Sequence, residues 1–240
     1  MLINGRNSVR ETLRSGTKIS KVFVQANLQG RENAELVTAL IQQGVAVITL
    51  PKREMDKKVQ GRHQGFIAEV EDFVYTDIDV VLQNARAQGK QLFLCILDGI
   101  EDPHNLGSII RSCECAGVDA VVISERGACQ VNATVVKVSA GAINHLPIVK
   151  VGNINNTIKR LKKDGVWVYG VELGGKSMYD IDFCRDMAIV IGSEGKGISR
   201  LTKELCDDIL TIPMFGKVNS LNASNATAIS LYEVIRQRMR

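Results

Sequence analysis

Apolar residues after position 91 occur in short unbroken runs, and a stretch with helical spacing follows each run. The runs cover residues 92–97, 120–124, 147–151, 166–171, 188–191 and 209–212. Unbroken apolar runs are typical of strands that are buried on both faces. Their alternation with helices predicts a parallel sheet covered on both sides, which is a doubly wound α/β domain over residues 91–240.

A second, shorter alternation fills the first part of the chain. Helical spacing occurs at 8–14 and 32–43, and strand patterns occur at 21–25, 46–50 and 66–70. The stretch that follows is polar and weakly patterned, which favours a partly helical linker. We therefore expect a small α/β domain over residues 1–72, a linker over 73–90 and the larger domain over 91–240.

Ligands of parallel α/β sheets bind beyond the carboxyl ends of the strands, so the loops after Leu97, Ile191 and Ile212 are the places to look for a site. In the first loop, Asn105 occupies a position suited to a helix cap. Arg111 projects away from the apolar stripe of the helix that follows. A capping asparagine and a solvated arginine would also explain this pair without any ligand.

The second loop, residues 192–197, contains three glycines around Glu194. Glycines let a backbone approach a ligand closely. The loop lacks the Lys-Ser/Thr ending of a phosphate-binding loop and the glycine order of a dinucleotide turn. Because a central carboxylate would repel phosphate, the loop suits a cationic or hydroxyl-bearing ligand.

The third loop carries an excess of small polar residues before a terminal helix. One helix needs one cap, yet four candidates lie within six residues, and Ile212 and Leu221 add apolar contact. The four candidates are Ser220, Asn222, Ser224 and Asn225. A simple turn would explain this loop alone, but three such loops at one edge of a sheet predict a site.

Composition narrows the class of protein. The chain has 240 residues, of which 45% are hydrophobic and 23% charged, which is ordinary for a globular protein. No apolar run approaches the roughly 20 residues of a membrane span, and the first residues do not resemble a signal peptide, so we expect a cytoplasmic protein without membrane association. The six cysteines form no C-x-x-C pair and are expected to be reduced core residues. The three histidines lack metal-site spacing, so no metal is expected.

The charge is mildly positive, and its excess lies in the first 72 residues. A dense basic segment there is a candidate for binding phosphates of RNA, and it consists of Lys52, Arg53, Lys57, Lys58 and Arg62. Because two acidic residues lie among these five, a solvated helix face is the alternative interpretation.

The three loops together resemble a known family. Asn105-x-Gly107-x-x-x-Arg111, the segment 191–197, and the segment from Ile212 to Ser224 resemble the three motifs of SpoU-type (TrmH family) RNA 2'-O-ribose methyltransferases in the SPOUT superfamily. The segments 4–9 and 63–65 are similar to the substrate-binding domain of this family, which is L30e-like. The resemblance is closest to the bacterial branch that methylates a guanosine ribose in 23S rRNA.

The resemblance implies properties that the residue pattern does not. It implies a deep C-terminal trefoil knot, a homodimer and S-adenosyl-L-methionine as methyl donor. It implies that the cofactor is held around Gly192, Ile212, Ser220 and Leu221, and that the reacting ribose is surrounded by Asn105, Arg111, Glu194 and Asn222. One departure is Asn225, which stands where the family commonly has valine.

Two questions remain open at this level. The family assigns proton removal to the residue matching Arg111, but a guanidinium holds its proton firmly, so stabilising the adjacent phosphate and the developing alkoxide is an equally physical role. The substrate could also be a tRNA, or the chain could be a non-catalytic RNA-binding module. The tail residues Arg236, Arg238 and Arg240 join the basic segment as candidate RNA contacts.

Overall fold

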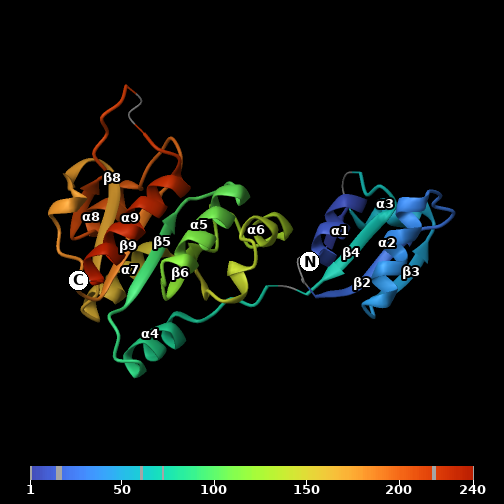
Figure 1. The fold of residues 1–240 in the computed structure, drawn as a ribbon, viewed down its shortest axis with the longest axis horizontal. Helices are drawn as coiled ribbons and strands as arrows, with labels where there is room; N and C mark the ends of the chain where they lie inside the picture. Colours follow the sequence, from blue (N-terminus) through green and yellow to red (C-terminus); the bar gives the residue numbers. More distant parts are fainter. Residues whose placement is uncertain (1, 15–17, 60–61, 72, 218–219, 240) are drawn as a thin grey trace. The chain divides into compact units, whose positions relative to one another are not determined.

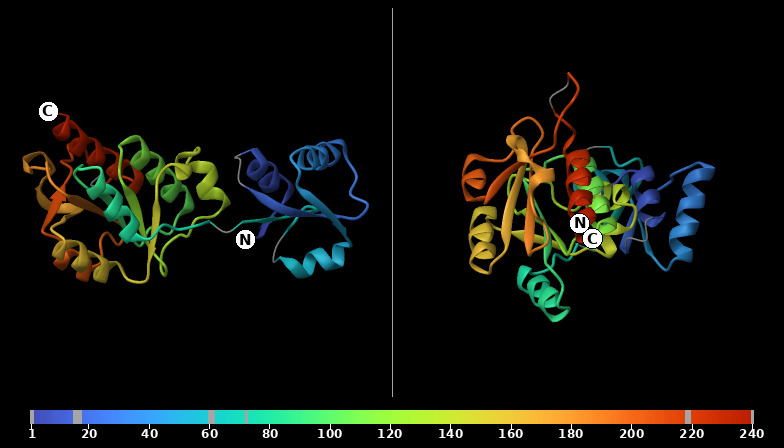
Figure 2. Two further views of the ribbon diagram at one scale, coloured as in Figure 1. Left: turned by 90° about the horizontal axis from the view of Figure 1, so that it is seen from below. Right: turned by 60° about the vertical axis from the view of Figure 1, so that its left-hand side comes forward.

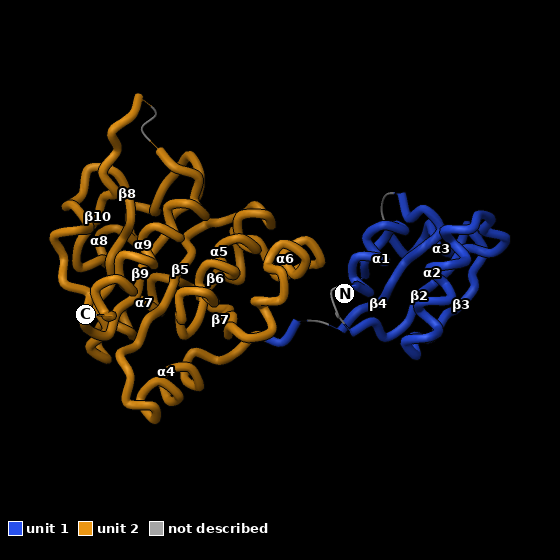
Figure 3. Tube along the Cα trace, viewed as in Figure 1, with its two compact units in different colours: residues 1–74 blue, residues 75–240 orange. Residues whose placement is uncertain are grey.

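The chain divides into two compact units, residues 1–74 and residues 75–240 (Figure 3). The computed structural model describes residues 2–14, 18–59, 62–71, 73–217 and 220–239. The predicted domain boundary at residue 72 and the predicted RNA contact Arg240 lie outside the described residues. Residues 73–90 include helix α4 (Ile78–Ala87), whose apolar side belongs to the core of the second unit.

Among its described residues, the first unit has a four-stranded sheet and three helices. Along the chain it contains β1 (Leu2–Asn4), α1 (Arg6–Arg14), β2 (Ile19–Gln25), α2 (Arg31–Gln42), β3 (Ala46–Leu50), α3 (Lys52–Lys58) and β4 (Phe66–Val70). The strand order is β1-β4-β2-β3, with β2 and β3 parallel and the other pairs antiparallel. The short strand β1 has too few residues to show a strand pattern, and the sequence did not predict it.

The second unit contains the predicted parallel sheet. Its strands are β5 (Phe93–Asp98), β6 (Ala120–Ser124), β7 (Ile148–Val151), β8 (Trp167–Ser177), β9 (Met187–Gly192) and β10 (Asp208–Thr211). They pair in the order β10-β8-β9-β5-β6-β7, and every pair is parallel. The prediction of a parallel α/β sheet is therefore confirmed, with strand limits displaced by a residue or two, except that β8 continues well beyond residue 171.

Helices cover both faces of this sheet (Figure 1). One face carries α4, α7 (Ile154–Lys163) and α8 (Arg200–Leu205), and the opposite face carries α5 (Pro103–Cys115), α6 (Ala133–Val138) and α9 (Ala223–Arg238). Both views in Figure 2 place α5 and α9 on the other side of the sheet from α7. Two short 3-10 turns, Ala142–Asn144 and Met178–Asp180, complete the unit.

The central pair β5 and β9 sets the position of two of the predicted loops. The strands are in continuous register from Phe93 opposite Met187 to Asp98 opposite Gly192. Parallel strands that end together deliver their following loops to the same edge of the sheet. The loop leading to α5 and the glycine-rich loop 193–197 therefore start side by side.

The six cysteine side chains differ in burial. All six are free; Cys95 and Cys113 are buried, while Cys115 and Cys184 are exposed. Burial raises the pKa of the Cys113 thiol, and the neighbouring Cys95 raises it further. The prediction of core residues thus holds for Cys95 and Cys113 and is wrong for the two exposed cysteines, because Cys115 is the last residue of α5 and Cys184 lies in the loop before β9.

No helix among the described residues is both long and apolar enough to cross a membrane. Within the same residues, no three His, Cys, Asp or Glu side chains are grouped so that they could hold a metal ion.

Helix α5 packs closely on α6 at Gly107, which generates a stability prediction. A methyl group at Gly107 would lie 2.7 Å from Val138 Cβ and 3.1 Å from the Val135 carbonyl oxygen. Alanine gains about 1 kcal/mol of helix propensity over glycine, but overpacking costs about 1–3 kcal/mol. We expect Gly107→Ala to lower the free energy of unfolding by about 1 kcal/mol.

The measurement is urea unfolding followed by fluorescence of Trp167, the one tryptophan, which lies in β8 and reports on the second unit. Gly152→Ala is the matched control, because a methyl group there would meet no atom within 4 Å. Equal stability of the two variants would contradict the predicted close packing of α5 on α6.

Candidate active site

Three polar side chains from distant parts of the chain meet at the carboxyl edge of the sheet. Asn105 Nδ2 donates to Glu194 Oε1 at 3.0 Å, and Asn222 Nδ2 donates to Asn105 Oδ1 at 2.9 Å. Asn222 Nδ2 also donates to Glu194 Oε1. The two amides therefore fix each other and the carboxylate, and we call these three residues the polar triad.

Asn105 lies in the first turn of α5, and its backbone explains why. Asp102 is the helix cap, because its carboxylate accepts hydrogen bonds from the backbone amides of His104 and Asn105 at 3.1 and 3.3 Å. The prediction that Asn105 caps this helix is wrong. Pro103 follows the cap in the position that proline favours, so the helix begins earlier than the apolar stripe suggested. The Asn105 side chain is thereby free to join the polar triad.

Asn222 has two roles at once. Its Oδ1 accepts from the backbone amide of Ser224 at 2.9 Å and from Ser224 Oγ at 2.6 Å, so it caps α9. Its Nδ2 faces Asn105 and Glu194. The excess of cap candidates is explained in part: Asn222 is the cap, Ser224 supports it, and Asn225 is exposed on the helix.

The glycine-rich loop is a tight backbone turn. Ser193 and Gly197 exchange two backbone hydrogen bonds at 3.1 and 2.9 Å. Gly192 has no room for a side chain, since a methyl group there would lie 2.1 Å from the Gly197 carbonyl carbon. Glu194 projects from this turn towards Asn105 and Asn222, the other two members of the polar triad.

A cavity of 520 Å³ lies between this loop, the end of β8 and the segment leading into α9. Its volume is in the range of small-molecule sites. The four residues predicted to hold a cofactor all line it: Gly192, Ile212, Ser220 and Leu221. Other apolar walls come from Val171, Ile191, Ala223 and Ala226, and polar walls include Glu172, Glu194 and Asn222.

A second cavity of 460 Å³ adjoins the first across the glycine-rich loop. It is lined by the loop 98–102, Asn105 and Gly127, and it shares Ser193, Glu194, Lys196 and Gly197 with the first cavity. The polar triad therefore stands between two ligand-sized spaces.

Arg111 is separate from the other three predicted ribose-binding residues. It is exposed on α5 and lines neither cavity. Its projection away from the buried stripe agrees with the sequence analysis, but the described chain does not bring it into contact with the polar triad.

The sequence analysis missed Glu172, which lies in the wall of the first cavity. One carboxylate oxygen accepts from the Ile198 backbone amide at 2.9 Å, and the other pairs with Lys203. Glu172 thus ties the end of the glycine-rich loop to β8 and α8. The signal that could have found it is the same one that found the other loops, because Glu172 follows the apolar run 166–171.

The predicted RNA-binding residues of the first unit lie on or just after α3. All five are exposed, and Lys58 Nζ lies 4.3 Å from the centroid of the Phe23 ring. Met55 alone is buried on this helix. The cationic side chains therefore form an outward-facing basic surface, which consists of Lys52, Arg53, Lys57, Lys58 and Arg62.

The two described tail arginines both form contacts within their own unit. Arg236 forms a two-pronged ion pair with Glu233 at 2.8 Å. Arg238 donates to four backbone carbonyl oxygens of its own unit. Its guanidinium is used inside the fold, which argues against an RNA contact at Arg238.

Comparison with known proteins covers almost the whole chain. Residues 92–232 match the SpoU rRNA Methylase family, and residues 2–76 match the RNA 2'-O ribose methyltransferase substrate-binding family. A Staphylococcus saprophyticus protein named for the TrmH family of tRNA/rRNA methyltransferases is 41% identical over 239 residues, which are 99% of this chain and 96% of that protein. The Bacillus subtilis protein YacO, named for the same family, is 40% identical over 98% of this chain and 94% of its own.

Solved structures agree in fold. The SpoU methyltransferase AviRb from Streptomyces viridochromogenes, solved in complex with AdoMet, has a TM-score of 0.68 at 24% identity, covering 100% of this chain and 90% of AviRb. A TrmH family protein from Porphyromonas gingivalis has a TM-score of 0.64 at 26% identity, with the same shares covered. Two matching family models that together span the chain, and relatives about two-fifths identical along its length, place this protein in the SpoU/TrmH family of RNA methyltransferases.

Proposed function

We propose that this protein methylates the 2'-hydroxyl of a guanosine ribose in 23S rRNA, with S-adenosyl-L-methionine as methyl donor. The observation that carries the proposal is the polar triad between two adjoining cavities. One cavity suits a cofactor and the other a nucleoside. The match of the first unit to a 2'-O-ribose substrate-binding family supports the position of the methylated atom.

S-adenosyl-L-methionine is the cofactor, and the residues of the larger cavity fit it. Apolar walls at Ile212 and Leu221 suit a flat base, while Ser220 and backbone groups near Gly192 provide polar partners. Glu194 adds negative charge beside the space. When bound, the cofactor supplies a methyl group on a positively charged sulfur, which takes the electron pair of the broken carbon–sulfur bond.

The chain's own residues orient the acceptor. Asn105 and Glu194 line the smaller cavity and are held rigid by Asn222, so they can fix a ribose by hydrogen bonds. Arg111 supplies positive charge for the phosphate beside the reacting sugar and for the alkoxide that develops there. Its distance from the triad in one chain supports a homodimer in which a partner copy completes the site.

Three further proposals concern the homodimer, the knot and the location of the protein. Exposed Ile229 and Tyr232 on α9 support the homodimer, which light scattering of the purified protein would test. The insertion of β9 between β8 and β5, followed by the return of α9 to α5, supports the trefoil knot. Stretching the chain from its termini would test the knot, because a knotted chain stops short of its full length. A substrate made in the cytoplasm supports a cytoplasmic location.

We propose that residues 1–72 form an L30e-like RNA-binding domain and that residues 91–240 form the knotted methyltransferase domain. The proposed linker, residues 73–90, carries α4, which packs on the second unit. The basic surface on α3 supports the role of the first domain, since phosphates dominate RNA affinity. A tRNA substrate is the second candidate, because the relatives' names include tRNA. The intact triad argues against a non-catalytic module.

The cofactor site is tested by Gly192→Ala. A methyl group would lie 2.1 Å from the Gly197 carbonyl carbon, so the glycine-rich loop must move. We expect the dissociation constant for S-adenosyl-L-methionine to rise by roughly tenfold or more, measured by calorimetry. Gly216→Ala is the control, because a methyl group there meets no atom within 4 Å. Unchanged affinity in Gly192→Ala, with the fold verified by circular dichroism, would remove the loop from the cofactor site.

The reaction is tested by mapping 2'-O-methyl marks in total RNA from cells that lack the protein. We expect one guanosine mark to disappear from 23S rRNA, to return with the wild-type chain or Arg200→Ala, and not to return with Arg111→Ala. Arg200 is an exposed arginine outside both cavities and serves as the matched control. A missing mark in tRNA would assign the tRNA substrate, and no missing mark would refute the proposal. Restoration by Arg111→Ala would refute the role of that arginine.

The basic surface is tested by reversing two charges with Lys52→Glu and Lys57→Glu. Both side chains are exposed and have no ion-pair partner among the described residues, so the fold should tolerate the change. We expect RNA affinity to fall about tenfold at low salt, with a shallower dependence on salt concentration. Lys159→Glu with Lys163→Glu on α7 is the matched control. Equal affinity of both double variants would exclude α3 as an RNA contact.

A further inference from the structure

The last turn of α9 is anchored to the amino ends of the two central strands. Arg238 Nη1 donates to the Gln91 carbonyl oxygen at 3.2 Å, and Nη2 donates to the Leu92 carbonyl oxygen at 3.2 Å and the Arg185 carbonyl oxygen at 2.6 Å. Nε donates to the Phe183 carbonyl oxygen at 3.3 Å. These carbonyls belong to the segments that lead into β5 and β9.

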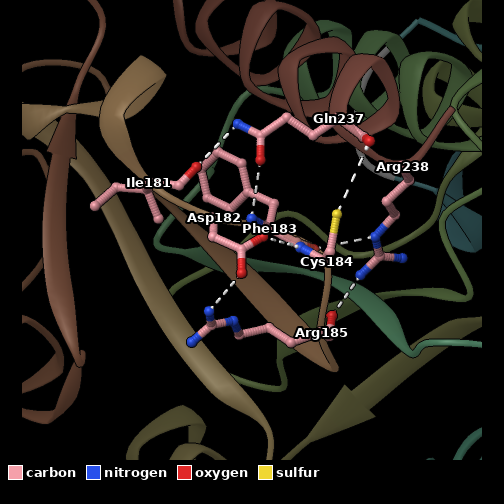
Figure 4. Close-up of polar contacts among 7 residues, drawn as sticks. All are labelled: Ile181, Asp182, Phe183, Cys184, Arg185, Gln237 and Arg238. Atoms are coloured by element: carbon pink, nitrogen blue, oxygen red, sulfur yellow. Dashed lines mark hydrogen bonds and ion pairs between the residues drawn. The ribbon is translucent and has the colours of Figure 1, made fainter. Parts of the chain in front are cut away.

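The neighbouring Gln237 bonds the same segment before β9, residues 181–185 (Figure 4). Its Oε1 accepts from the Phe183 backbone amide at 3.0 Å, and its Nε2 donates to the Ile181 carbonyl oxygen at 2.9 Å. The loop itself is stiffened by Asp182, which accepts from the Cys184 amide at 2.9 Å and pairs with Arg185 at 2.8 Å. The bonds of Gln237 and Arg238 therefore join the end of α9 to a stiff loop before β9.

The opposite end of α9 meets the same two strands. Its cap Asn222 bonds Asn105, which follows β5, and Glu194, which follows β9. A helix of 16 residues spans about 24 Å, and it is held at its two ends by the two ends of one strand pair. The position of Asn222 along the helix axis thus depends on where the far end is fixed.

The buried face of α9 packs on α5 and on β9. Its buried face is mostly small or polar, with Ala223, Thr227, Ser230 and Glu233 beside the larger Leu231 and Val234. Thr227 and Ser230 bond carbonyl oxygens of their own helix rather than the sheet. The hydrogen bonds described above, which join α9 to the two strands, therefore lie at its two ends.

We propose that Arg238 is a positioning residue for methyl transfer, which acts through α9 to hold Asn222 against Asn105 and Glu194. The proposal rests on the proposed function of the polar triad. A guanidinium suits this role because it presents several donors in a fixed plane, whereas lysine has one compact charge. Arg238 also lies 5.0 Å from the centroid of the Phe93 ring at the start of β5, which holds the plane in place.

The test compares Arg238→Ala and Arg238→Lys with Arg200→Ala, which removes an exposed arginine on α8. Methyl transfer to RNA is measured with each variant at a temperature where circular dichroism shows it folded. We expect kcat to fall roughly tenfold or more in both Arg238 variants, because small displacements of positioning groups are costly, while the KM for RNA changes little. Arg200→Ala should keep its kcat, and added guanidinium ion should restore part of the kcat of Arg238→Ala only.

Hydrogen exchange gives a readout that does not require activity. The Ser224 amide, which bonds the Asn222 cap, should exchange faster in both Arg238 variants and not in Arg200→Ala. If the wild-type protein methylates no RNA but this exchange pattern holds, the proposed function fails, whereas the link from Arg238 through α9 to Asn222 is supported. Folded Arg238 variants with wild-type kcat and wild-type exchange at Ser224 would overturn the link itself.

Discussion

The continuous register between β5 and β9 is the constraint on which the site depends. It places Asp98 opposite Gly192, so the loops that carry Asn105 and Glu194 leave the sheet side by side. Asp98 also accepts from the Ser199 backbone amide at 2.8 Å, which ties the far end of the glycine-rich region to β5. A slip of one residue in this pair would turn each following side chain to the opposite face and separate the two loops.

The polar triad combines one carboxylate with two amides and no cation. Both amide groups direct their Nδ2 donors at the same oxygen of Glu194, which holds the carboxylate in place without cancelling its charge. A carboxylate held in this way remains able to attract a cationic ligand. Neutral partners therefore suit a site for a positively charged methyl donor better than an ion pair would.

The sequence predicted the sheet and the three loops, because these follow from local patterns, whereas the resemblance to the family supplied the roles of the site residues. Unbroken apolar runs indicate buried strands, and glycines or cap residues at strand ends indicate loops that can hold ligands. The errors have the same local origin. Asp102 rather than Asn105 caps α5 because Pro103 lets the helix begin before the apolar stripe, and Glu172 lies in the part of β8 that continues beyond the apolar run.

The basic tail is the clearest case in which tertiary structure changed the interpretation. Charge alone made Arg238 a candidate RNA contact, but its guanidinium lies among carbonyl oxygens of residues more than fifty positions away in the chain. The sequence by itself determined the class of fold, the edge of the sheet that carries the site and the resemblance to a methyltransferase family. Only the tertiary structure decided which side chains meet, because hydrogen bonds between Asn105, Glu194 and Asn222 join segments 89 and 117 residues apart, a separation that leaves no periodic trace in a sequence.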